Sequence, residues 1–235
     1  MSSLTVIVLA GGFGTRLQDL HPHIPKPMIP VAGKPFLEWV LHYYINQGAT
    51  TAIISLGHLA QVAHSHFASH PAAIETVLVT EPQAMGTGGA VRFAAAAPLS
   101  DPFLVVNGDS LVVADLSPAR SWLQEEHLDG VVLGVRVPDT SRYGSLSIAE
   151  DSTLLGFREK QPGAGVINAG VYFFRKRLLD LFPKTTPLSM ELDVFPALLA
   201  AGSHLKVLAV EAPFLDIGTP QSLAEAEAFI QSNFQ

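Results

Sequence analysis

The sequence predicts one α/β domain over residues 1–235, with a mixed, mostly parallel β-sheet, flanking helices and an inserted β-hairpin. Three observations predict it. Short, almost continuously apolar segments recur along the chain, and segments with helical spacing separate the early ones. The regular alternation then gives way to a short polar turn between two β-prone segments. No linker, low-complexity run or internal repeat divides the chain.

Seven segments are expected to be strands. Each has four to eight residues and is nearly all apolar, which is typical of strands buried on both faces of a mostly parallel sheet. They are Thr5–Leu9, Ala52–Leu56, Thr76–Val79, Phe103–Val106, Val131–Val137, Ile167–Phe174 and Lys206–Val210.

Helical spacing separates these strands. In Phe36–Gln47, apolar residues at positions 36, 40, 43 and 44 place one stripe against the sheet. Alternation of strand and helix up to about residue 137 favours right-handed βαβ units. The other segments with helical character are about His58–Ser69, Gly88–Ala97, Pro118–His127, Arg175–Leu181, Glu191–Ala201 and Gln221–Ser232.

The pattern changes after residue 137. Tyr143–Ile148 and Thr153–Arg158 are β-prone and flank the turn-like segment Ala149–Ser152. Two such segments around a short polar turn predict an antiparallel hairpin.

Composition excludes several classes of function. The chain has 14 basic and 21 acidic residues, and a net charge of −7 argues against binding a nucleic-acid backbone. It contains no cysteine, so disulfide scaffolds, thiol nucleophiles and thiolate metal sites are excluded. The apolar run Leu4–Ala10 is too short to span a membrane and lacks the flanks of a secretory peptide. We therefore expect a soluble, cytoplasmic protein with neither nucleic-acid nor membrane partners.

A glycine-rich loop directly follows the first strand. Glycine allows positive φ angles and close approach of a ligand, and successive N–H groups can bind an anion. Arg16 adds a cationic fork suited to phosphate oxygens. Leu17 stands where a dinucleotide fingerprint needs its third glycine, and no Walker A sequence follows. The segment reads Leu9, Ala10, Gly11, Gly12, Phe13, Gly14, Thr15, Arg16, Leu17.

Lys26 lies between two prolines in Pro25-Lys26-Pro27. Proline fixes φ and disfavours helix in the preceding residue, so this lysine is expected on a stiff, non-helical segment. Near a phosphate-binding loop it can direct a point charge at a polyphosphate.

The glycine loop followed by Lys26-Pro27-Met28 resembles the signature of sugar-1-phosphate nucleotidyltransferases, most of all the heptose and short mannose 1-phosphate guanylyltransferases. The resemblance covers nearly the whole chain and implies a Rossmann-like (GT-A-like) fold and Mg²⁺ as cofactor. It implies Arg16, Lys26 and Asp109 as catalytic residues. It allows a homodimer. The nucleotide-binding residues that it implies are Leu9, Ala10, Gly11, Gly12, Gly14, Thr15, Arg16, Glu81, Gly86 and Thr87.

Two aspartates are candidates for the metal. Asp109 follows the strand Phe103–Val106 at its carboxyl edge, a place suited to Mg²⁺, although a turn or N-cap role is the commoner fate of an aspartate after glycine. Asp216 lies among apolar residues before Gly218, where a carboxylate is costly unless paired or bound to a cation. The resemblance implies both as metal ligands. Ser110 and Leu111 supply no second carboxylate of an Asp-x-Asp pair, which argues against a glycosyltransferase.

Glu81 precedes a loop that opens a helix. In the resembling family this loop reads the nucleobase, and a carboxylate can accept the two adjacent donors of guanine, so Glu81 favours GTP. Two alternatives stay open: backbone groups around Gly86 dominate base recognition, or Glu81 only caps the helix.

The sugar-phosphate site is implied by resemblance alone. Lys160 would bind the sugar phosphate and the other residues would border the sugar. The structural alternatives are ordinary hairpin polarity and a β-bulge at Gly170. The residues are Asn107, Gly108, Glu159, Lys160, Asn168 and Gly170.

The expected function is transfer of a nucleoside monophosphate, GMP from GTP above others, to a sugar 1-phosphate, D-glycero-α-D-manno-heptose 1-phosphate above others. The alternatives are a mannose-1-phosphate guanylyltransferase, and a uridylyl- or thymidylyltransferase acting on a sugar such as glucose or N-acetylmuramate 1-phosphate. A regulatory subunit that binds a sugar nucleotide without catalysis is the non-enzymatic alternative.

Overall fold

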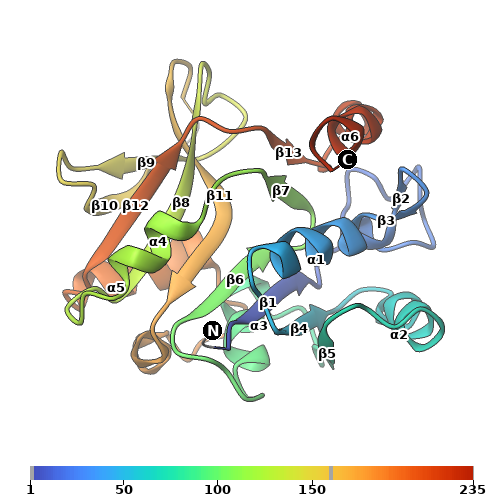
Figure 1. Ribbon diagram of the computed structural model, residues 1–235, viewed down its shortest axis with the longest axis horizontal. Coiled ribbons are helices and arrows are strands. Elements are labelled where there is room, and N and C mark those ends of the chain that lie inside the picture. Colours follow the sequence, from blue (N-terminus) through green and yellow to red (C-terminus); the bar gives the residue numbers. More distant parts are fainter. Residues whose placement is uncertain (1–2, 159–160, 235) are drawn as a thin grey trace.

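A mixed β-sheet runs through the middle of the molecule with helices on both faces (Figure 1). This computed structural model describes residues 3–158 and 161–234. Within them the main sheet has nine strands: β1 (Thr5–Ala10), β4 (Thr51–Leu56), β5 (Glu75–Thr80), β6 (Phe103–Asn107), β8 (Gly130–Val137), β9 (Ser145–Ile148), β10 (Leu154–Arg158), β11 (Gly165–Phe174) and β12 (Leu205–Val210). All seven predicted strands and the predicted hairpin, β9–β10, are present.

The end of β1 lies at a topological switch point of the sheet, where the strand order reverses. Strands β6, β1, β4 and β5 are parallel neighbours, with β4 and β6 on opposite sides of β1. Strand β11 is antiparallel to both β6 and β8, and β12 is parallel to β8. The predicted mostly parallel, mixed sheet is therefore confirmed, although β11 separates β6 from β8. In open α/β sheets, ligands bind at the carboxyl ends of the strands at such a switch point.

The α-helices cover both faces of the sheet. Helices α1, α2, α4 and α6 bury apolar side chains against one face, and α3 and α5 against the other. Figure 1 shows α1 crossing in front of β1 and β6. Their bounds are α1 (Phe36–Asn46), α2 (Ala60–Ser69), α3 (Gly86–Ala94), α4 (Ser117–Trp122), α5 (Phe195–Ala200) and α6 (Pro220–Asn233).

Three predicted helices differ from the structure. Lys176–Leu181 is a 3₁₀-helix, and it ends at Phe182 because the residue before Pro183 disfavours helical ψ. Met190–Val194 is a π-turn that leads into α5, since Pro196 lacks the N–H that would continue an α-helical ladder. Helix α4 ends at Trp122, and the chain continues in i→i+3 turns up to Leu128.

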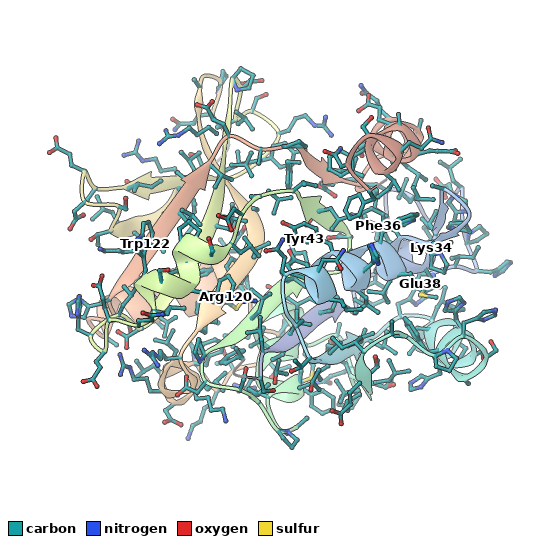
Figure 2. All side chains as sticks on the ribbon, viewed as in Figure 1. Lys34, Phe36, Glu38, Tyr43, Arg120 and Trp122 are labelled. Carbon is teal, nitrogen blue, oxygen red and sulfur yellow. The ribbon has the colours of Figure 1, made fainter. Side chains whose placement is uncertain are left out.

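Two short ribbons escaped prediction because each strand has only two or three residues. One pairs β2 (Pro30–Val31) with β3 (Lys34–Pro35). The other pairs β7 (Ser110–Val112) with β13 (Phe214–Asp216) in antiparallel fashion, with Asp216 opposite Ser110. The hydroxyl of Tyr43, which extends from α1 (Figure 2), donates to the carbonyl of Ala114 at 2.7 Å and accepts from its N–H at 3.0 Å. These bonds anchor the segment after β7 to α1.

None of the helices formed by residues 3–158 and 161–234 combines the length and the apolar character needed to cross a membrane.

Candidate active site

The glycine loop leaves the carboxyl end of β1 and packs against two other site residues. Gly14 has a φ of +59°, the left-handed conformation that glycine adopts without strain. A Cβ at Gly14 would lie 3.0 Å from Cβ of Lys26. A Cβ at Gly11 would lie 2.3 Å from Oε1 of Glu81, a contact that no side chain could make. Glycine is therefore required at both positions for the loop to sit between Lys26 and Glu81.

A cavity of about 360 Å³ opens beside this loop. It contains two cationic side chains and two carboxylates, and its glycine wall exposes backbone to the cavity. Such a mixture of charges suits a phosphate chain accompanied by a cation. The lining residues are Leu9, Ala10, Gly12, Gly14, Thr15, Arg16, Lys26, Pro27, Asp109, Asp216 and Gly218.

Lys26 joins the two predicted metal ligands. Its Nζ donates to Oδ2 of Asp109 at 2.6 Å and to Oδ1 of Asp216 at 3.2 Å. The side chain of Lys26 is only 12% exposed. The structure thus brings Lys26 together with Asp109 and Asp216, which follow it in the sequence by 83 and 190 positions. Lys26 was expected to face a polyphosphate. Here its ammonium group faces the two carboxylates, because opposite charges at this distance attract one another.

The electrostatics of this cluster follow from burial and pairing. Burial alone would lower the pKa of Lys26, but the charges and hydrogen bonds of Asp109 and Asp216 outweigh it and raise the pKa above its usual 10.5. Lys26 therefore stays charged at neutral pH.

The two carboxylates also suit a divalent cation. Both contact one ammonium group, which lies beside the glycine loop. Among the described residues, no third histidine, aspartate or glutamate completes a metal-binding group with them. Two carboxylates with the rest of the coordination left to water and phosphate oxygens is the arrangement that Mg²⁺ prefers.

A second cavity, of about 260 Å³, adjoins the first and shares Leu9, Gly12 and Asp109 with it. Its walls are largely apolar, with the polar group of Glu81 among them. Its other lining residues are Gly11, Phe13, Ala84, Met85, Gly86, Thr87, Ala90 and Asn107.

Glu81 is held firmly in this second cavity. Its Oε1 accepts a hydrogen bond from the hydroxyl of Ser55 at 3.0 Å, and its Oε2 accepts one from the N–H of Met85 at 3.2 Å. Burial raises the pKa of Glu81 above its usual value, and the two hydrogen bonds offset part of that rise. The hydrogen bond from Met85, the residue before α3, corresponds to the alternative in which Glu81 caps this helix. Glu81 also lines the cavity, so the two roles are compatible.

The start of α3 lines the second cavity with Gly86 and Thr87, and its next residues bond to a distant segment of the chain. The N–H groups of Gly88 and Gly89 donate to the carbonyl of Leu188 at 2.8 and 3.2 Å. Gly86 has a φ of +72° and lies against the same carbonyl. The hydroxyl of Thr87 accepts from the N–H of Met190 at 2.9 Å. These contacts explain why α3 begins two residues earlier than predicted.

The residues predicted near the sugar are partly assembled at the end of β6. Gly108 donates its N–H to the carbonyl of Leu9 at 2.8 Å, so this amide is used inside the protein. Gly170, with a φ of +70°, lies in a register shift of β11, which is the predicted bulge. A Cβ there would overlap the side chain of Asn107.

Asn168, also on β11, is fixed by polar contacts. Its Nδ2 donates to Oε1 of Glu191 and to the hydroxyl of Tyr172, both at 2.8 Å. From the sequence, Glu191 was expected only to begin a helical segment, and the hydrogen bond from Asn168 connects it to β11. The predicted Glu159 and Lys160 lie outside the described residues.

Two further residues of the site were not predicted. Gly218 lies so close that a Cβ would be 2.8 Å from Oδ1 of Asp216 and 3.2 Å from Nζ of Lys26. Phe13 lines the second cavity. Phe13 lies within the glycine-rich loop and Gly218 follows Asp216, so their position in these two segments was the sequence signal that could have identified them.

A glycine loop at a switch point, a cationic pair and a carboxylate pair define an α/β protein that acts on phosphorylated ligands. Comparison with known proteins makes this class specific. The family model for nucleotidyl transferases matches residues 5–233. The chain belongs to this nucleotidyltransferase family.

Several known members are similar over almost the whole chain. Two crystal structures of HddC from Yersinia pseudotuberculosis, one complexed with GMP-PN, share 33% identity over 97% of this chain and 99% of theirs, with TM-scores of 0.82 and 0.83. The D-glycero-alpha-D-manno-heptose 1-phosphate guanylyltransferase of Aneurinibacillus thermoaerophilus is 29% identical over 97% of this chain and 99% of its own length. The mannose-1-phosphate guanylyltransferase of Mycobacterium tuberculosis is 34% identical over 94% of this chain, which spans 63% of that relative's length.

Proposed function

We propose that this protein is a sugar-1-phosphate guanylyltransferase, which transfers GMP from GTP to D-glycero-α-D-manno-heptose 1-phosphate and releases pyrophosphate. The observation that carries the proposal is the pair of adjoining cavities that share Asp109. One is charged and lined by the glycine loop, and the other is largely apolar, with Glu81 as a second carboxylate beside the shared Asp109. A nucleotide needs both kinds of surface within one short distance.

Transfer to heptose 1-phosphate is the first candidate, because two relatives named D-glycero-alpha-D-manno-heptose 1-phosphate guanylyltransferase, 29% and 31% identical, match over 97% and 93% of this chain. Transfer to mannose 1-phosphate is the second candidate, because the mycobacterial relative has a higher identity, 34%, than either heptose relative, 29% and 31%.

In the proposed reaction an oxygen of the sugar phosphate attacks the α-phosphorus of GTP, and the bond to pyrophosphate breaks on the opposite side. A phosphate monoester is ionised near neutral pH, so the attack needs no general base. The barrier must then be lowered by alignment and by neutralising charge. Arg16 lies in the charged cavity where it can contact the triphosphate. The carboxylate form of Glu81 would accept the paired donors of guanine.

Asp109 and Asp216 would hold Mg²⁺, with water and phosphate oxygens completing its coordination. When bound, the ion supplies positive charge to phosphate oxygens on which negative charge develops. Lys26 Nζ contacts both carboxylates. With Mg²⁺ held by Asp109 and Asp216, the ammonium group of Lys26 would be available to the phosphates bound in the same cavity.

Pyrophosphate release tests the proposal. Purified protein with Mg²⁺ is offered GTP, ATP, CTP or UTP together with heptose, mannose, glucose or N-acetylmuramate 1-phosphate. We expect the fastest release with GTP and the heptose substrate. Asp109→Asn should abolish release, whereas Asp115→Asn, a change at an exposed carboxylate on the segment after β7, serves as the matched control and should not. Binding of nucleotide without release in every combination would instead support a regulatory subunit.

A further inference from the structure

Phe13 is an exposed aromatic residue at the rim of the apolar cavity. Its side chain is 56% exposed, although most large apolar side chains of the protein are buried. An exposed aromatic face at the edge of a binding site is typical of a surface that a ligand covers. Phe13 stands between Gly12 and Gly14, where the backbone of the loop does not itself require an aromatic side chain.

The backbone around Phe13 fixes where its ring lies. Gly14 is in the left-handed conformation and lies against Lys26, so the loop turns immediately after Phe13. The ring packs against His58, with ring centroids 5.3 Å apart and planes inclined at 34°. His58 follows β4 and precedes α2, so it supports the Phe13 ring from a different element.

The cavity beside Phe13 combines the apolar walls and the hydrogen-bond acceptor that a nucleobase needs. Its apolar walls include Leu9, Met85 and Ala90, and the carboxylate of Glu81 is one of the acceptors within it. A base bound by its edge to Glu81 would have one flat face toward a wall of this cavity. Among the described residues that line this cavity, Phe13 is the one with an aromatic side chain.

We propose that the ring of Phe13 stacks on the base of the bound nucleotide and that His58 positions this ring. The inference rests on the proposed nucleotide-binding function and deepens it. A purine offers two fused rings to the stack and a pyrimidine only one, so Phe13 contributes to the preference for GTP over UTP. Base–aromatic stacks are sequence-tolerant, so selection between GTP and ATP stays with Glu81.

Phe13→Ala tests the stack by its effect on binding rather than on chemistry. Its Kd for GTP, measured by calorimetry, should rise about 5–150-fold. The Kd for inorganic tripolyphosphate and the KM for the sugar 1-phosphate should not change, because neither carries a base. Phe13→Leu keeps apolar area without a π-face and should recover only part of the affinity. An equal loss for GTP and tripolyphosphate, or no loss for GTP, would overturn the proposal.

A fluorescent variant reports the stack directly. In Phe13→Trp, GTP should quench the added indole emission while tripolyphosphate should not, with the wild-type protein, which carries two tryptophans, as the blank. Unchanged indole emission with saturating GTP would count against stacking. His58→Ala should raise the Kd for GTP less than Phe13→Ala does, and His58→Phe should restore it. The quench is independent of turnover, so it remains measurable if no sugar 1-phosphate is a substrate and the proposed function fails.

Discussion

Replacing Lys26 by methionine removes the positive charge between Asp109 and Asp216 while keeping a side chain of similar length. The two contacting oxygens lie 2.6 and 3.2 Å from Nζ, so 2.6 plus 3.2, or 5.8 Å, is the greatest distance between them. Two unit charges at that separation repel by about 3 kcal/mol at an effective dielectric constant of about 20. The carboxylates are 35% and 29% exposed, which lets water screen part of this energy. We expect Lys26→Met to lower the free energy of unfolding by about 1–3 kcal/mol.

Thermal unfolding measures this effect. In EDTA, Lys26→Met should unfold about 2–12 °C below the wild type, from roughly 2–4 °C per kcal/mol for a chain of this size. Mg²⁺ at millimolar concentration should raise the Tm of the variant more than that of the wild type, because the cation takes the place of the ammonium group. Lys184→Met, at an exposed lysine, is the control. Equal Tm values in EDTA, or an equal response of both proteins to Mg²⁺, would refute the reasoning.

Three other substitutions test separate parts of the site. Arg16→Ala should lower kcat by about 10³–10⁵ with little change in Tm, because Arg16 is exposed and lines the phosphate cavity; steady-state kinetics and calorimetry check this. The raised pKa of Glu81 means that protonation begins at higher pH than for an ordinary glutamate, so the KM for GTP should rise as pH falls toward that pKa, and Glu81→Gln should flatten the profile. Asn168→Ala should raise the KM for the sugar 1-phosphate about tenfold and leave the KM for GTP unchanged; an equal rise in both would remove Asn168 from the sugar site.

The strands and the glycine loop could be predicted because their signals are local. Thr5–Leu9 is apolar after its first residue, and the first glycine, Gly11, follows two residues after Leu9. The ends of the helices could not be predicted as well, because distant groups set them. In the first turn of α3, the N–H groups of Gly88 and Gly89 donate to the carbonyl of Leu188, about a hundred residues later. No window of sequence contains both partners.

The site shows the same division. Asp109 and Asp216 could be singled out by their motifs, but their contact with one ammonium group depends on a three-residue ribbon, β7–β13, that is too short to leave a periodic signal. The prolines around Lys26 predicted a stiff, non-helical segment, and the residue instead begins a short 3₁₀-helix with its ammonium group on the aspartates. Phe13 and Gly218 belong to the site through position alone, which the residue type did not reveal.

The pairing of β7 with β13 has a consequence for how the protein comes into being. The glycine loop, Glu81 and Asp109 are all translated within the first half of the chain, whereas the second carboxylate arrives more than a hundred residues later. The paired carboxylates therefore exist only after β13 has emerged and paired with β7, and a chain interrupted before that point lacks Asp216.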